Sequence, residues 1–286
     1  MLYLARHALI NDASHQLTQH CQHLLSIEFH WHASPLNMAS DYSYTFFRVS
    51  QTDHVKTSAV QYRQLRLTAL QTSPDAFSST YDVESAFDDN VWEQRLCENG
   101  KETFICAASH ITSGTTEWVG QLTLRGPLSR SDYDLPEESG QPPADPGEHV
   151  ELWQMLSLFN LPDHRGRGLA KKLCQEALFY LENERPASSL VVRLMVKPQN
   201  SAAVHLYQSL GFEDVGRCTL AEALLANGES EFLPDDYSTR VDYSTRAGLI
   251  MTRRIMLHRR ETSGDGLNSG RTLERQVLKS IVAPQG

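Results

Sequence analysis

The most constraining feature of this chain is an apolar run that leads directly into a glycine-rich turn. Residues 151–162 read ELWQMLSLFNLP, which is typical of a strand buried on both faces. The turn DHRGRG follows, and apolar residues then recur every four positions, at Leu169, Leu173, Ala177 and Leu181, as on one face of a helix. This order of strand, short turn and helix predicts a crossover unit at the centre of a mixed sheet.

The glycine-rich turn is a candidate anion site. A turn that enters a helix presents backbone N–H groups at the positive end of the helix dipole, which suits phosphate or pyrophosphate. Gly166 and Gly168 let the backbone approach a ligand closely, and Arg165 and Arg167 can add charge-assisted hydrogen bonds. Taken alone, the segment leaves open a charged helix-entry turn that binds no ligand.

The spacing disfavours two nucleotide-binding motifs. A P-loop requires a lysine followed by a hydroxyl residue after its second glycine, and no such pair follows Gly168. A dinucleotide fold requires a third glycine, where this chain has Lys171. It also requires an acid after the next strand, whereas Glu182 and Glu184 fall in the same predicted helix as Lys171. Acyl-coenzyme A is a third ligand with a pyrophosphate, and the turn alone does not select it.

Further patterns on both sides of this unit predict the rest of a sheet with helices. Strands are predicted at 44–50, 103–111, 116–126, 189–197 and 247–257. Helices are predicted at 54–74, 83–100 and 198–212. Asn200 or Ser201 caps the last of these helices, and Gly211 ends it. The resulting order βαα–ββ–β–α–β–α–β favours a mixed sheet with helices on both faces.

Two segments match the spacing of known signatures. LFNLPDHRGRGLAKKL has Arg165, Gly168 and Ala170 at the positions of Q/R-x-x-G-x-G/A. NSAAVHLYQSLGF matches N-x-x-A-x-x-L-Y-x-x-x-G-F at Asn200, Ala203, Leu206, Tyr207, Gly211 and Phe212. Both segments resemble the signatures of the GNAT N-acetyltransferase superfamily. LRLTALQTSPDAF, at 65–77, is similar to the amino-terminal helix and loop of these enzymes.

This resemblance covers roughly residues 44–258 and implies a fold. The fold is α/β (α+β): a mixed, mostly antiparallel central sheet of about six or seven strands, with helices on both faces and a splayed central strand pair. Residues 1–43 are then an N-terminal extension, and 44–258 are the acetyltransferase domain. Loop insertions are expected at 126–149, as a mobile loop, and at 217–247, and a disordered tail is expected at 259–286.

The resemblance also implies roles for residues of this chain. Backbone groups of Leu158, Phe159 and Asn160 would bind the pantetheine arm. Backbone amides of the turn would hold the pyrophosphate, namely those of Arg165, Gly166, Arg167, Gly168, Leu169 and Ala170. Asn200, with Ala203 beside it, would contact the cofactor arm or fix the splayed strands. Tyr207 would protonate the leaving thiolate, and its alternative is an aromatic side chain packed under the helix.

The general base is the least constrained assignment. A primary amine has a pKa near 10 and arrives protonated, so a base must take its proton as it attacks a thioester. Glu151 is the first candidate, although it lies seven residues before Leu158. His149 and Glu148 are further candidates at the edge of a loop, and each has a solvated-surface alternative.

Composition limits the partners. The net charge of −9 and a pI near 5.7 disfavour nucleic acid. No run of about 18 apolar residues could span a membrane, and the first residues lack a signal peptide, so a cytoplasmic location without membrane contact is expected. Histidines near the N-terminus have no carboxylate or cysteine at ligand spacing, so no metal is expected; these are His15, His20, His23, His30 and His32.

The resulting hypothesis is an N-acetyltransferase that moves an acetyl group from acetyl-CoA to an amine of a small molecule or peptide, by direct attack in a ternary complex. Acidic residues in 126–149 and 217–247 favour a cationic amine, or are ordinary soluble surface. The chain is expected to be a monomer or a homodimer. The alternative function is an acyl-CoA-binding regulatory module with weak or no turnover.

Overall fold

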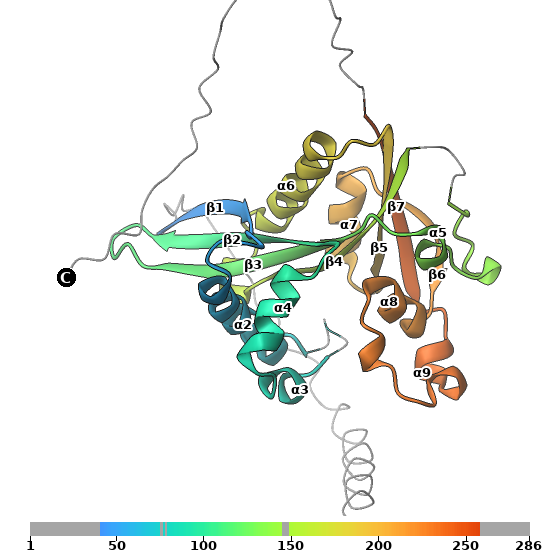
Figure 1. Cartoon of the computed structure of the whole chain (residues 1–286), viewed down its shortest axis with the longest axis horizontal. Helices are drawn as coiled ribbons and strands as arrows, with labels where there is room; N and C mark the ends of the chain where they lie inside the picture. Colours follow the sequence, from blue (N-terminus) through green and yellow to red (C-terminus); the bar gives the residue numbers. More distant parts are fainter. Residues whose placement is uncertain (1–40, 75–76, 78, 145–148, 258–286) are drawn as a thin grey trace, which may run out of the picture. The chain divides into compact units, whose positions relative to one another are not determined.

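The computed structural model describes residues 41–74, 77, 79–144 and 149–257. Within these residues, seven strands form one sheet in the order β1-β2-β3-β4-β5-β7-β6 (Figure 1). The strands are β1 (Tyr42–Arg48), β2 (Lys101–His110), β3 (Thr116–Arg125), β4 (Val150–Asn160), β5 (Ser189–Val196), β6 (Glu213–Cys218) and β7 (Gly248–Met256). The β4–β5 pair is parallel, and every other neighbouring pair of this sheet is antiparallel. The expected mixed, mostly antiparallel sheet is confirmed.

The central parallel pair separates part of the way along its length. Pairing between β4 and β5 runs from Val150↔Ser189 to Met155↔Leu194, and residues 156–160 of β4 continue without a partner on β5. On its other edge β4 stays paired with β3 up to Asn160. A register shift near Gln121 and a φ of 57° at Ser157 mark a bulge there. The expected splayed strand pair is therefore confirmed.

Helices cover both faces of the sheet (Figure 1). One face carries α6 (Leu169–Glu184) and α7 (Ser201–Ser209), and we call it the α6 face. The opposite face, the α2 face, carries α2 (Val55–Thr72), α3 (Tyr81–Ser85), α4 (Asp89–Cys97) and α8 (Leu220–Asn227). The predicted crossover between the parallel strands is made by α6, which follows β4 and precedes β5.

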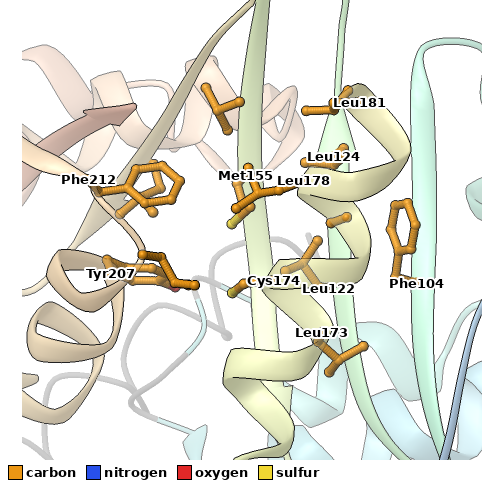
Figure 2. Packing of buried hydrophobic residues seen from close by; sticks show 14 of the residues in the cluster. Phe104, Leu122, Leu124, Met155, Leu173, Cys174, Leu178, Leu181, Tyr207 and Phe212 are labelled. Atoms are coloured by element: carbon orange, nitrogen blue, oxygen red, sulfur yellow. The ribbon is translucent and has the colours of Figure 1, made fainter. Parts of the chain in front are cut away.

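The main core lies between the sheet and α6. Leu173, Ala177 and Leu181 are fully buried, and Leu169 is nearly so, which confirms the four-residue repeat in this helix. Figure 2 shows Leu173, Leu178 and Leu181 of α6 packed over side chains of the strands, including Leu122 and Leu124 of β3. Burial of each leucine side chain contributes roughly 1.5–3 kcal/mol to folding.

The single helix expected over residues 83–100 is instead two helices. The side chain of Asp88 accepts a hydrogen bond from the Val91 N–H at 3.0 Å and caps α4, so the chain leaves α3 before that point. Trp92 and Leu96 face inward as expected. The helix ends at Cys97, and Gly100, with a φ of 79°, forms the turn into β2 rather than the helix cap.

The insertion at 126–149 is more ordered than a mobile loop. It contains α5 (Arg130–Tyr133) and a 3₁₀ turn, η2 (Glu137–Ser139), while 145–148 lie outside the described residues. Tyr133 and Gln141 are buried, and both accept hydrogen bonds from the fully buried Arg193 of β5. A buried guanidinium requires such acceptors, and the insertion supplies them.

The segment 217–247 is also more structured than a polar loop. It begins inside the edge strand β6, which the sequence pattern did not indicate because EDVGRC is polar and contains glycine. Helix α8 follows, with a capping box in which Thr219 and Glu222 bond each other's backbone N–H groups. The rest comprises η4 (Ser230–Phe232), η5 (Tyr237–Thr239) and α9 (Val241–Ser244).

The two predicted terminal segments lie largely outside the described part of the chain. Residues 1–40 and 258–286 are not described, so the N-terminal extension, its histidines and the predicted tail are not addressed. The first strand starts at Tyr42, two residues inside the expected extension. Among the described residues, no helix combines the length and apolarity needed to cross a bilayer.

Replacing Leu181 by alanine should lower the free energy of unfolding by about 2–5 kcal/mol, because the side chain is fully buried and its removal leaves a cavity. Chemical denaturation monitored by circular dichroism measures this change. Phe179→Ala is the matched control on the same helix, since Phe179 is 61% exposed and should cost less than about 0.5 kcal/mol. Equal losses in the two variants would contradict the described orientation of α6.

Candidate functional site

The site begins where β4 leaves β5. Residues 156–160 of β4 keep their hydrogen-bonded partner β3 on one edge and have no β5 partner on the other. Backbone groups along an unpaired strand edge can pair with an extended ligand that carries amide groups, as an added strand would. Leu158 and Phe159, which the sequence placed in such a site, lie in this segment.

The glycine turn lies at the end of the same strand. Gly166 and Gly168 have φ values of 74° and 76°, in the left-handed region that favours glycine. A Cβ atom at either position would meet no other atom within 4 Å, so the turn is open on that side. Gly168 is the N-cap residue of α6 and has no side chain to bond the first N–H groups of the helix. This geometry suits an anion at the helix start.

The Asn160 side chain supplies part of the N-terminal cap of α6, because Gly168 has no side chain to do so. In the amide orientation that satisfies both groups, its oxygen accepts a hydrogen bond from the Ala170 N–H at 3.0 Å, and its nitrogen donates to the Phe159 carbonyl at 2.9 Å. The Ala170 amide, expected to face a phosphate, thus already has a partner. The side chain lies so close to β3 that a Cβ at Gly120 would fall 2.1 Å from the Asn160 amide group.

Arg165 connects the turn to its surroundings. Its Nε donates to the Asn160 carbonyl at 3.0 Å, and its Nη2 donates to Ser73 Oγ, just after α2, at 3.1 Å. The guanidinium also lies 5.3 Å from the centre of the Phe159 ring. The Asn160 carbonyl is therefore occupied, and the Arg165 side chain holds the turn in place. Arg167 is exposed on the same turn.

Asn200 and Tyr207 both lie at α7. The Asn200 side chain accepts a hydrogen bond from the Ala203 N–H at 3.2 Å and caps the helix, while Gly211, with a φ of 81°, ends it. Tyr207 is buried on the α6 face, with its ring 5.8 Å from that of Phe212. Figure 2 shows Tyr207 of α7 opposite Cys174 of α6.

Burial has a direct effect on the Tyr207 phenol. It raises the pKa of Tyr207 well above its usual value, and the neighbouring Cys174 adds to the rise. The phenol is therefore protonated at neutral pH and can only donate its proton or a hydrogen bond. Both the packed and the acid-donor interpretations of this residue fit its position.

Glu151 does not lie with the other site residues. Its carboxylate accepts two hydrogen bonds from Arg185, each at 2.9 Å, and a third from Trp153 Nε1 at 3.0 Å. It pairs with Leu190 near the first residue of β4, and Leu158 lies seven positions further along the strand, about 23 Å away. This ion pair and this distance argue against the prediction that Glu151 is the base. His149 directly precedes the same end of β4, and Glu148 is not described.

The sequence analysis missed a set of buried polar residues on the α2 face. Gln121 of β3, Gln154 of β4 and Arg193 of β5 are each 0% exposed. The signal was present, because a polar residue interrupts each apolar strand run, as in LWQML and VVRLM. In the described part of the chain, no group of three or more His, Cys, Asp or Glu side chains is placed to hold a metal ion.

Asn160→Ala should destabilise the protein by about 0.5–2 kcal/mol, because the variant lacks the acceptor for the Ala170 N–H. Thermal unfolding measures the change. The control is Asn183→Ala, whose exposed amide donates to a carbonyl one turn earlier in the same helix and should be near neutral. Wild-type stability in Asn160→Ala would show that α6 does not depend on this cap.

Comparisons with known proteins give a match to a family model and distant similarities to solved structures. The Acetyltransferase (GNAT) family model matches residues 72–212. No curated protein matches the chain. Arabidopsis thaliana NAA60 in complex with acetyl-CoA is 16% identical, with 74% of this chain and 99% of that chain covered and a TM-score of 0.45. A GNAT-family acetyltransferase from Streptococcus pneumoniae is 14% identical, with 74% and 100% covered and a TM-score of 0.47.

The matched region spans the end of α2, the splayed strand pair, the glycine turn and the LYQSLGF segment. The sequence signatures, the family model and the observed sheet thus concern the same residues. Residues 72–212 of this chain form a GNAT acetyltransferase domain.

Proposed function

We propose that this chain is an N-acetyltransferase that transfers the acetyl group of acetyl-CoA to an amine of a small molecule or peptide. The observation that carries the proposal is the unpaired segment of β4, which leads directly into the open glycine turn at the start of α6. An extended arm with amide groups fits the first feature, and a pyrophosphate fits the second. Coenzyme A has both in sequence.

In this proposal the donor lies along β4. The amides of the pantetheine arm complete the free edge of residues 156–158, and the backbone amides from Gly166 to Leu169 bind the pyrophosphate. The Arg165 N–H, expected to join them, already donates to the Pro162 carbonyl at 3.1 Å. Arg165 supports the turn from behind through Asn160 and Ser73. Asn200 acts indirectly, because it fixes the start of α7 and with it the position of Tyr207.

The chemistry is a direct attack of the amine on the thioester carbonyl. Charge develops on the carbonyl oxygen, and a backbone N–H near the bulge at Ser157 can stabilise it. As the C–S bond breaks, Tyr207 protonates the thiolate of coenzyme A. The raised pKa of Tyr207 keeps this proton in place until a strong acceptor forms beside it. No covalent enzyme intermediate is needed.

One observation favours the alternative, an acyl-CoA-binding module with little turnover. The first candidate for the base, Glu151, is held by Arg185 far from the splayed segment. The two functions separate in a screen of amine classes with acetyl-CoA, with detection of released thiol. Binding of acetyl-CoA without acceleration of thiol release by any amine would favour the module.

Gly168→Asp should weaken coenzyme A binding by at least about tenfold, because it adds a side chain and a negative charge at the proposed pyrophosphate site, about 1.4 kcal/mol or more. Titration calorimetry measures the affinity. Gly114→Asp is the matched control, since Gly114 has a φ of 69° and similarly open surroundings but lies in the β2–β3 hairpin turn. Unchanged affinity in Gly168→Asp would refute the binding assignment.

Tyr207→Phe should lower kcat by about 10²-fold or more, because the thiolate then leaves without its proton donor. The ring packing against Phe212 is retained, so the melting temperature and coenzyme A affinity should stay near those of the wild type. Steady-state thiol release gives kcat. A kcat within a factor of two of the wild type would leave Tyr207 with a packing role alone.

A further inference from the structure

The buried polar side chains of the α2 face form a chain of hydrogen bonds. Arg193 Nε donates to Gln154 Oε1 at 2.7 Å, and Gln154 Nε2 donates to Asn227 Oδ1 at 3.1 Å. Asn227 Nδ2 then donates to Glu229 Oε2 at 3.4 Å. An arginine can only donate and a carboxylate can only accept, so the two ends fix the orientation of both amides between them. Every donor in this series of hydrogen bonds points toward Glu229.

This series of hydrogen bonds starts where the central strands β4 and β5 separate. Gln154 and Arg193 are directly paired across β4 and β5, one residue before the last pair, Met155↔Leu194. Asn227, at the end of α8, contacts Gln154, and Glu229 follows two residues later. The carboxylate of Glu229 is therefore tied to the point of separation, on the face opposite α6.

Glu229 also lies beside α2. Burial is the main cause of the raised pKa of Tyr62, and the charge of Glu229 adds to it. The pKa of Arg66 is raised against the effect of its burial, mainly by its hydrogen bonds to Glu84, with a smaller contribution from Glu229. Arg66 lies 4.4 Å from the Phe77 ring, which lies 5.4 Å from that of Phe159 in the unpaired segment.

A second buried side chain on this face, that of Gln121, has an acceptor atom without a hydrogen-bond donor in the described part of the chain. Gln121 is 0% exposed, and its Oε1 has no hydrogen-bond partner within the described residues. Its Nε2 donates to the carbonyl of Ser157, at the bulge in β4, at 3.4 Å. Because an unsatisfied buried acceptor is costly, a ligand with N–H groups is a fitting partner for it.

We propose that Glu229 accepts the proton of the acceptor amine, directly or through one water, and that Arg193, Gln154 and Asn227 position it. The inference rests on the proposed acetyltransferase function. The acceptor then enters from the α2 face, opposite the donor-side helix, with its nitrogen between Glu229 and the splayed segment. Gln121 Oε1 accepts a hydrogen bond from the same nitrogen.

The protons and electrons balance as follows. The ammonium gives one proton to Glu229, and the lone pair of the resulting amine forms the N–C bond at the thioester carbonyl. The tetrahedral intermediate collapses with cleavage of the C–S bond, and the sulfur takes the proton of Tyr207. The nitrogen then loses its second proton, which restores the Tyr207 hydroxyl through solvent, and Glu229 releases its proton to solvent. The products are the acetamide, coenzyme A thiol and one proton.

The test uses Glu229→Gln in the full chain with two acceptors of the active class: an alkyl amine that is protonated at the assay pH, and an analogue with a pKa below it. For the protonated amine, kcat/KM should fall by about 10²-fold or more. The neutral analogue should lose less than about tenfold, because it arrives without the proton that Glu229 removes. The matched control is Glu213→Gln, an exposed carboxylate on β6, which should behave as wild type.

Two further variants separate catalysis from architecture. Glu229→Asp keeps the carboxylate and should recover most of the rate. Asn227→Ala should produce a smaller loss with the same dependence on amine pKa, which a merely structural role would not produce. Calorimetry should find acetyl-CoA affinity unchanged in all of these variants.

The outcomes are distinguishable. Equal losses for both amines in Glu229→Gln would assign Glu229 to substrate binding and overturn its role as the base. A rate within twofold of the wild type would also overturn that role. If the wild-type chain acetylates amines and Glu229→Gln does so at the same rate, the proposed function stands and only the role of Glu229 is refuted. A wild-type chain that binds acetyl-CoA but acetylates no amine refutes both.

Discussion

The separation of β4 from β5 is the constraint on which the rest of the site depends. Two parallel strands that part in the middle of a sheet leave backbone groups that need partners. β3 supplies them on one edge as far as Asn160, and side chains of Asn160 and Arg165 bond the last two carbonyls of the strand. What is left is the edge of 156–158, next to a helix start whose own N-cap is a glycine. Both belong to one continuous stretch of chain, so one extended ligand that carries an anion would satisfy them together.

The second organising group is the buried guanidinium of Arg193. Burial lowers its pKa to about 10, so it remains charged at neutral pH, yet its hydrogen-bond acceptors are neutral oxygens of Tyr133, Gln141 and Gln154. The centre of the Tyr133 ring lies 4.3 Å from the guanidinium carbon of Arg193. Because a buried cation needs several such partners, it joins the 126–144 insertion, the central strands and, through Asn227, the end of α8. The two insertions are thus parts of one assembly on the α2 face.

The sequence was most informative where pattern and local chemistry agree. The period of α6, the Asn200 cap, the two glycines of the turn and the splayed pair were all predicted, because each depends on neighbours in the chain or on a signature that spans them. The helix break at Asp88, the edge strand β6 and helix α8 were missed, although Asp88 and the Thr219–Glu222 capping box are local signals that mark two of them.

The assignment of Glu151 shows what the sequence could not provide. Its partner Arg185 lies 34 positions away, and only the register of the parallel pair and the path of α6 bring the two together. The same holds for Arg193 with Gln141 and for Gln154 with Asn227, whose meeting depends on how the insertions pack. The polar residues in these strands are visible in the sequence, but their partners depend on contacts between distant segments.

Cys174 illustrates a different requirement of such a site. A thiolate beside an activated thioester would exchange with it and be acylated, so a thiol next to Tyr207 is a chemical hazard. Burial among apolar side chains raises the pKa of Cys174 to about 12, and at neutral pH only about one molecule in 10⁵ then carries the thiolate. The apolar packing that stabilises α6 therefore also keeps this sulfur inert, which in the proposed reaction prevents transfer of the acyl group to the protein itself.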